Sequence, residues 1–207
     1  MDERIAHALV WLDYAAVAVF GATGALAAAR RKHDIVTFGF FAAITGVGGG
    51  TLRDLLLGAP VFWIDRWGYL AACLTAALVI WLTGLGRGRQ RVLLWLDAVG
   101  LAAYSVVGAA KALALGAPAL PSMVMGVLTA CFGGVIRDVL AHEESVLLKR
   151  EIYVTCAVVG AGLFVILRGF GLPGLPAGLI GAGAAFGVRA GAILWNWTLP
   201  GFPGRED

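Results

Sequence analysis

Apolar residues fill most of the chain in long runs that short polar connections separate. The runs cover about residues 5–29, 35–50, 67–85, 92–115, 119–136, 152–168 and 176–197. A transmembrane helix needs about 20 consecutive apolar residues, whereas a transmembrane strand alternates apolar and polar positions. These runs are apolar on every face, so the pattern predicts an all-α, polytopic membrane protein with seven transmembrane helices. The second and fifth runs are short for a full crossing.

The polar positions reveal an internal repeat, because the second half of the chain matches the first at a shift of 84 residues. Charged residues are only 14% of the chain, so coincident charges are hard to obtain by chance. Each unit, 5–85 and 92–168, holds three spans, so the second unit enters the membrane from the opposite side. We expect two inverted repeats plus a seventh helix at 176–197, in one transmembrane domain over 1–207. The coincident pairs include Arg53 with Arg137, Asp54 with Asp138, Asp13 with Asp97, and Tyr69 with Tyr153.

Glycines end the second and fifth runs, in the phrases GVGGGTLRDLLLG at 46–58 and CFGGVIRDVL at 131–140. Each glycine inside a helix costs about 1 kcal/mol relative to alanine, and freed backbone groups at membrane depth need burial or water. The pattern predicts a break in both helices beside a water-filled path; glycines that only permit close packing are the alternative. The residues expected to break the helices or line the path are Thr45, Gly48, Gly49, Gly50, Thr129, Phe132, Gly133 and Gly134.

An Arg-Asp pair follows each glycine group, and two interpretations of these charges stay open. They lie at the mouths of the path and tune its field, or they anchor the helices by snorkelling to lipid headgroups. Neighbouring residues on a helix do not face each other, so Arg53 need not pair with Asp54. The same two interpretations apply to Arg137 and Asp138.

Three further charges lie within the spans. A charge buried in a membrane span needs a partner, and we expect Asp13 and Asp97 to partner Arg137 and Arg53, or to pair across the pseudo-two-fold axis. Lys111 coincides with Ala27 in the repeat, so symmetry does not explain it. Lys111 either snorkels to the interface or faces the path and takes part in gating.

Composition agrees with a chain that lies almost wholly in the membrane. Hydrophobic residues make up 60% of the sequence and mean hydropathy is +0.86, whereas a soluble domain carries about a quarter charged residues. The net charge of +3 then reflects the placement of loops, and nucleic acid is not an expected partner. Most basic residues fall on one side, namely Arg30, Arg31, Lys32, Arg87, Arg89, Arg91, Arg137, Lys149, Arg150 and Arg205. The positive-inside rule makes that side cytoplasmic, with the N-terminus outside and the C-terminus inside.

The sequence lacks the motifs that would indicate an enzyme. The three cysteines and three histidines are scattered without ligand or disulfide spacing, so neither a metal nor a cofactor is expected. The first glycine phrase lacks the Lys-Ser/Thr of a phosphate-binding loop. It also lacks the paired carboxylates that follow a similar phrase in tRNA nucleotidyltransferases. We therefore expect a protein that is not an enzyme.

The doubled glycine phrase, PVFW after the first copy and EIY after the second together resemble bacterial members of the trimeric intracellular cation channel (TRIC) family. The resemblance implies a homotrimer in the cell inner (plasma) membrane, surrounded by membrane lipids. It also implies a pore in each protomer lined by helices two and five, and conduction of monovalent cations, chiefly potassium but also sodium. Phe132 stands where the first copy has Gly48, and the Lys-Glu-Val segment of animal members, tied to phosphoinositide binding, is absent.

Two other functions stay open. A secondary transporter of a small solute such as glycine also suits inverted repeats with broken helices. A membrane scaffold without permeation is a weaker third interpretation.

Overall fold

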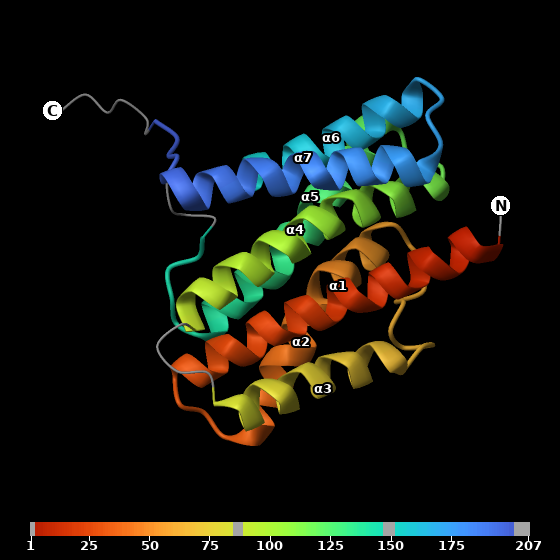
Figure 1. The fold of residues 1–207 in the computed structure, drawn as a ribbon. Helices are drawn as coiled ribbons and strands as arrows, with labels where there is room; N and C mark the ends of the chain where they lie inside the picture. Colours follow the sequence, from red (N-terminus) through yellow and green to blue (C-terminus); the bar gives the residue numbers. More distant parts are fainter. Residues whose placement is uncertain (1–2, 85–88, 147–151, 201–207) are drawn as a thin grey trace, which may run out of the picture.

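The chain folds into a bundle of long helices that run side by side (Figure 1). This computed structural model describes residues 3–84, 89–146 and 152–200, with residues 3–12 and 89 as backbone only. The described residues form α1 (Glu3–Arg30), α2 (Ile35–Leu56), α3 (Gly68–Thr83), α4 (Arg89–Ala114), α5 (Ala119–Leu140), α6 (Val154–Gly169) and α7 (Gly174–Trp195). The predicted all-α class with seven helices is therefore confirmed.

The two repeat units form the two halves of the bundle. In Figure 1, α3, α1 and α2 make up the lower half, α4 and α5 follow, and α6 and α7 lie at the top. The halves meet where α2 packs on α5 and α1 packs on α4, and α7 packs on α4 and α6. The interface between repeats is therefore built from equivalent helices of each unit.

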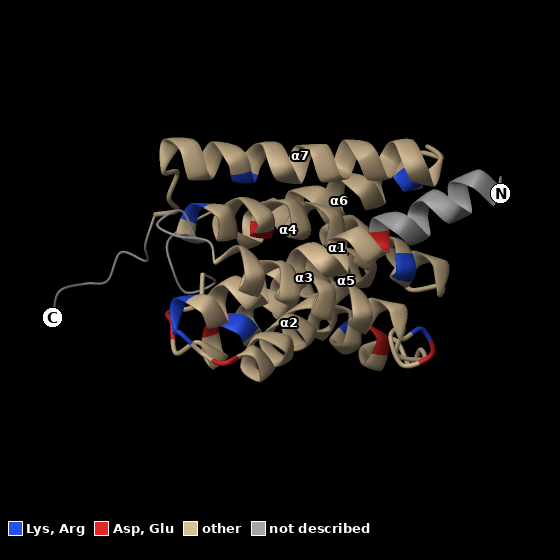
Figure 2. Ribbon diagram, turned by 60° about the horizontal axis from the view of Figure 1, so that its bottom comes forward, with Lys and Arg blue, Asp and Glu red and all other residues tan. Residues whose placement is uncertain are grey.

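Length and charge distribution fit a membrane-spanning bundle. Among the described residues, α2, α5, α7 and residues 90–114 of α4 are long and apolar enough to cross a bilayer, and α3 and α6 are shorter apolar helices. Figure 2 shows charged residues gathered toward the two ends of the bundle, with a middle that is mostly free of them. Large apolar side chains such as Leu82 and Leu179 are exposed, as expected for surfaces that face lipid.

Helices α1, α2, α4 and α5, and also α6, end in the same backbone motif, in which two amides past the helix bond back to carbonyls of its last turn. The motif needs a residue with left-handed backbone geometry, which glycine adopts at least cost. Gly58 after α2 (φ +63°) and Gly116 after α4 (φ +83°) fill this position at one end of the bundle. Lys32 after α1 (φ +57°) and His142 after α5 (φ +50°) fill it at the other.

Those four residues also show the inversion of the repeats. Gly116 lies 84 positions after Lys32, and His142 lies 84 positions after Gly58. Equivalent helices therefore end at opposite ends of the bundle. Of the basic residues used to predict orientation, Arg87, Lys149, Arg150 and Arg205 lie outside the described residues.

Candidate functional site: the crossing of α2 and α5 and its charged ends

Helices α2 and α5 cross at glycines that have no room for a side chain. A Cβ on Gly133 would lie 2.5 Å from the carbonyl oxygen of Thr45, and a Cβ on Gly49 would collide with the carbonyl oxygen of Thr129. The two contacts are related by the shift of 84 residues, so the crossing lies on the pseudo-two-fold axis. The glycines therefore bring two backbones into direct contact at the centre of the bundle.

The expected break in these helices is wrong. Helix α2 is continuous from Ile35 to Leu56 and α5 from Ala119 to Leu140, so both pass through their glycines without interruption. The close crossing explains the glycines, because a larger residue at Gly49 or Gly133 would push the helices apart. Both spans are consequently long enough to cross a membrane, although their apolar runs ended early in the sequence.

The other residues of the two motifs surround this crossing. Gly48 lies against Ile136, since a Cβ there would be 2.9 Å from its Cδ1 atom, and Gly50 lies against Phe62. Gly134 lies against the Tyr153 hydroxyl, and Phe132 is half-buried. The hydroxyl of Thr129 donates to the Met125 carbonyl at 2.6 Å. The buried hydroxyl of Thr45 has no hydrogen-bond partner among the described residues.

At one end of the crossing, Asp54 is fully buried and gathers three donors. The Nε atom of Arg53 lies 2.7 Å from its Oδ1, and Lys111 Nζ lies 2.7 Å from the same oxygen. The backbone amide of Phe62 donates to Oδ2 at 3.0 Å, and its ring lies 5.6 Å from the guanidinium carbon of Arg53. Two cations, Arg53 and Lys111, therefore share one carboxylate.

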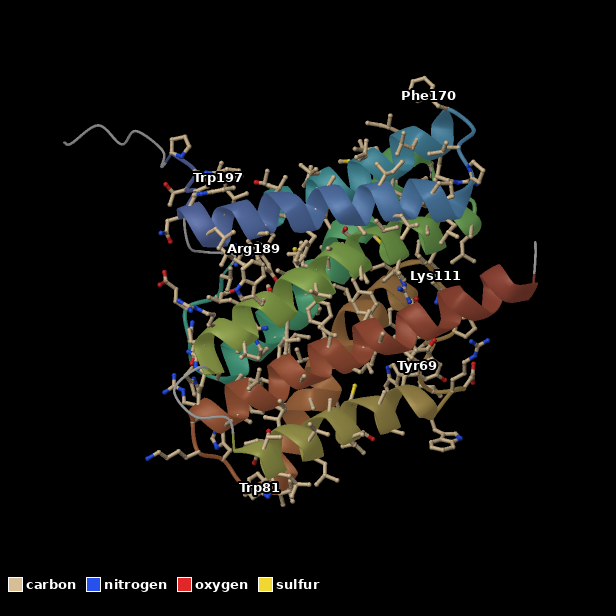
Figure 3. All side chains as sticks on the ribbon, in the orientation of Figure 1. Tyr69, Trp81, Lys111, Phe170, Arg189 and Trp197 are labelled. Atoms are coloured by element: carbon tan, nitrogen blue, oxygen red, sulfur yellow. The ribbon has the colours of Figure 1, made fainter. Side chains whose placement is uncertain are left out.

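A hollow of about 310 Å³ opens beside this network. Asp13 lies in its wall and accepts a hydrogen bond from the Tyr69 hydroxyl at 2.8 Å. The ring of Tyr69 stacks on Tyr14, with centroids 4.0 Å apart, which holds the hydroxyl in place. Figure 3 shows Lys111 and Tyr69 toward the same end of the bundle. The hollow is lined by Asp13, Arg53, Phe62, Asp65, Arg66, Tyr69, Val107 and Lys111.

At the opposite end of the crossing lies Arg137, which is buried. Its NH1 atom lies 2.6 Å from Asp97 Oδ1 and donates to the Thr23 hydroxyl at 3.1 Å. Its Nε donates to Asp138 Oδ1 at 2.9 Å, and the amide of Val146 donates to Oδ2 of the same carboxylate. Here one cation serves two carboxylates, the reverse of the balance around Asp54.

The charge pairs differ from the predicted ones. Arg137 pairs with Asp97 of its own repeat unit, so the expected pairing with Asp13 is wrong, and Asp97 does not pair with Arg53. Arg53 and Arg137 are both buried, which excludes snorkelling to headgroups. Each arginine instead donates through its Nε atom to Oδ1 of the aspartate that follows it.

The position of Lys111 matches neither of its two interpretations in full, which were snorkelling to the interface and facing the path. Its side chain is 31% exposed and ends on Asp54, so it bridges α4 to α2 and also lines the hollow. The equivalent position in the first repeat holds Ala27, which is buried. The pseudo-symmetry of the crossing is thus broken by this lysine.

Sequence reasoning missed three contributors to the site. Tyr69 stood in register with Tyr153, a signal that was visible in the repeat. Thr23 and Phe62 had no such signal, since their equivalents Val107 and Val146 have different side chains. The described residues contain no group of three or more His, Cys, Asp or Glu side chains able to bind a metal ion.

Comparison with known proteins adds sequence and structural relatives. A family model described as Glycine transporter matches twice, at residues 10–84 and 94–169, in agreement with the repeat. A UPF0126 membrane protein of Vibrio cholerae is 39% identical over 94% of this chain and 82% of its own length. The UPF0126 inner membrane protein YadS of Escherichia coli is 37% identical over 95% and 97%.

Solved structures share the fold. The TRIC trimeric intracellular cation channel orthologue from Rhodobacter sphaeroides has a TM-score of 0.89 and 46% identity, covering 92% of this chain and 99% of that one. A second TRIC cation channel has a TM-score of 0.82 at 28% identity, covering 95% and 98%. Both relatives are described as cation channels.

Proposed function

The chain belongs to the family of membrane proteins that includes the UPF0126 proteins and the bacterial TRIC channels, and from that membership we propose that it is a cation channel. Its close structural neighbours are channels and not enzymes. We further propose potassium as the main permeating ion and a homotrimer in the inner membrane, with one path in each protomer. The N-terminus lies outside and the C-terminus in the cytoplasm.

The glycine crossing between α2 and α5 is the observation that supports this path best. The carbonyl oxygens of Thr45 and Thr129 lie at the crossing, whereas the Thr45 hydroxyl lies against Gly24 of α1. Each carbonyl oxygen accepts one bond within its helix and keeps a second lone pair, with which it can contact a passing cation in place of a water molecule. The hollow beside Asp13 and Lys111 provides the entrance at one end. In the described conformation the two backbones touch, so conduction requires α2 and α5 to separate at Gly49 and Gly133.

Lys111 controls the entrance in this proposal. Its positive charge opposes cation entry, so K111M is expected to raise unitary potassium conductance in planar bilayers by about twofold or more. Asp54 keeps Arg53 and the Phe62 amide as partners in this variant. R168M is the matched control, because Arg168 is exposed and binds the Leu172 carbonyl away from the hollow. Equal conductance in K111M and the wild-type protein would contradict a role for Lys111 at the entrance.

Planar bilayers also test the function itself. Unitary currents that reverse at the potassium equilibrium potential support the channel. A secondary transporter of glycine is the alternative, favoured by the description of the family model. Saturable glycine uptake into proteoliposomes without unitary currents would support the transporter and reject the channel.

A further inference from the structure

A second hollow lies at the end of the bundle away from Lys111, where α1 and α3 end and α2 begins. Its volume is about 370 Å³. Trp81, which marks the site in Figure 3, lies on α3 at the same end as Arg189 and Trp197. The hollow is lined by Ala29, Lys32, His33, Phe38, Ile80, Trp81 and Gly84. One side of it is therefore cationic and the other side is apolar.

The backbone at Lys32 is unusual for a lysine. Its φ of +57° is left-handed, a region in which side chains other than glycine are disfavoured. The equivalent helix end in the second repeat has Gly116 in the same motif, so the fold itself accepts glycine here. A lysine in place of the residue that this backbone favours indicates that its side chain has a use.

The charge of Lys32 is available to a ligand. The neighbouring Arg30 is paired with Glu143 at 2.6 Å, and Arg31 binds the His142 carbonyl at 2.9 Å. Asp34 uses its carboxylate to cap α2, accepting from the Thr37 amide at 2.8 Å. Lys32 forms no ion pair among the described residues, and it lies in the wall of the hollow.

The apolar wall continues into a surface that faces lipid. Trp81, Leu78 and Leu74 follow each other at helical spacing on α3, and each is at least 42% exposed. Gly39 of α2 lies against Leu74, with 3.2 Å between an added Cβ and its Cδ2, so the stripe borders the α2–α3 contact. An acyl chain that leaves the hollow would therefore meet a continuous apolar surface.

We propose that this hollow binds the anionic phosphate headgroup of a membrane phospholipid. Lys32, with His33 beside it, holds the phosphate, and the first part of an acyl chain lies between Phe38, Ile80 and Trp81 and then along α3. Anionic lipids of the cytoplasmic leaflet attract basic residues placed at the membrane surface. The proposal does not depend on whether the protein conducts ions.

Thermal unfolding of the full chain in detergent provides the test. Phosphatidylglycerol should raise the melting temperature of the wild-type protein by about 3 °C more than phosphatidylcholine does. K32N should lose most of this difference, since asparagine tolerates the left-handed backbone but has no charge. K32R should keep it. H142N is the matched control, with the same backbone geometry outside the hollow, and should also keep it.

Several outcomes would overturn the proposal. K32N could keep the full preference for phosphatidylglycerol, or H142N could lose as much as K32N does. Inorganic phosphate at millimolar concentration could produce the same rise, which would assign the site to a free anion. W81A tests the acyl chain separately, because it should weaken stabilisation by long-chain phosphatidylglycerol and leave a short-chain analogue unaffected.

Discussion

Asp13 and Asp97 occupy equivalent positions in the two repeats but meet different partners. Asp97 faces the guanidinium of Arg137 at 2.6 Å, whereas Asp13 accepts from the neutral hydroxyl of Tyr69 at 2.8 Å. A hydrogen bond between two charged groups is about twice as strong as one from a neutral donor, so the two carboxylates should contribute differently to stability. The repeat thus supplies a natural comparison between two carboxylates in one protein.

We expect D97N to destabilise the protein more than D13N. D97N leaves Arg137 with Asp138 and the Thr23 hydroxyl as partners, and the lost hydrogen bond between charged groups should cost about 1.5–3 kcal/mol. D13N keeps an oxygen that accepts from Tyr69 and should cost about 1 kcal/mol. Unfolding in detergent, followed by tryptophan fluorescence, measures both. Equal costs would mean that the Asp97–Arg137 pair contributes nothing beyond an ordinary hydrogen bond.

Which charges pair could not be predicted from the sequence. The repeat showed that two aspartates and two arginines occupy equivalent positions in the two units, namely Asp13 with Asp97 and Arg53 with Arg137. Their partners depend on where each side chain reaches in three dimensions, and a crosswise and a direct pairing fit the same spacing. In the structure, the buried Arg137 pairs with Asp97 of its own repeat unit, which is the direct pairing.

At the scale of the element, the α2–α5 crossing depends on glycine at two positions. We expect G49A to destabilise the protein by about 1–3 kcal/mol, since its methyl group would collide with the Thr129 carbonyl. G183A in α7 is the matched control, because no atom lies within 4 Å of its added Cβ and alanine is the better helix former. Melting temperatures of both variants in detergent test this. A melting temperature for G49A at or above that of the wild-type protein would contradict the close crossing.

The start of α2 gives a pH-dependent prediction. The hydrogen bond from the Thr37 amide lowers the pKa of Asp34 below its usual value. Because the folded-state pKa is lowered, Asp34 stabilises the protein above the usual carboxylate pKa of about 3.9, and this contribution disappears as pH falls through the folded-state value. The melting temperature of D34A should therefore lie below that of the wild-type protein at pH 6, and the two should converge toward pH 3. A difference that persists undiminished at pH 3 would contradict the cap.

Helix positions were predictable because a membrane-spanning helix is marked by the length and apolar character of its run in the sequence. The ends of α1, α3, α4 and α7 lie within a few residues of the predicted spans. The interruption of α2 and α5 was predicted wrongly, because glycine both loosens a helix and lets two helices approach. Composition cannot distinguish these two effects. They are distinguished by the atom that faces the glycine in three dimensions, which for Gly49 is the carbonyl oxygen of Thr129.

For the whole molecule, the inverted repeat fixes a relation between the two sides of the membrane. Pro60 follows α2 and Glu144 follows α5, and they are equivalent positions exposed at opposite ends of the bundle. In whole cells, a membrane-impermeant thiol reagent should label P60C and leave E144C unlabelled until the membrane is permeabilised. Cys73, Cys131 and Cys156 are buried, so they add little background. Labelling of both positions from outside would rule out the inverted arrangement.

Lys32 has a consequence for how the chain enters the membrane. Basic residues beside a span hold that end on the cytoplasmic side during insertion, and Lys32 adds one to the cluster after α1. The residue that suits the finished backbone at this point is glycine, which carries no such signal. K32G would therefore make the folded protein more stable, and it would also remove one of the positive charges that orient the chain in the membrane. At this helix end, membrane insertion therefore favours lysine, whereas stability of the folded backbone favours glycine.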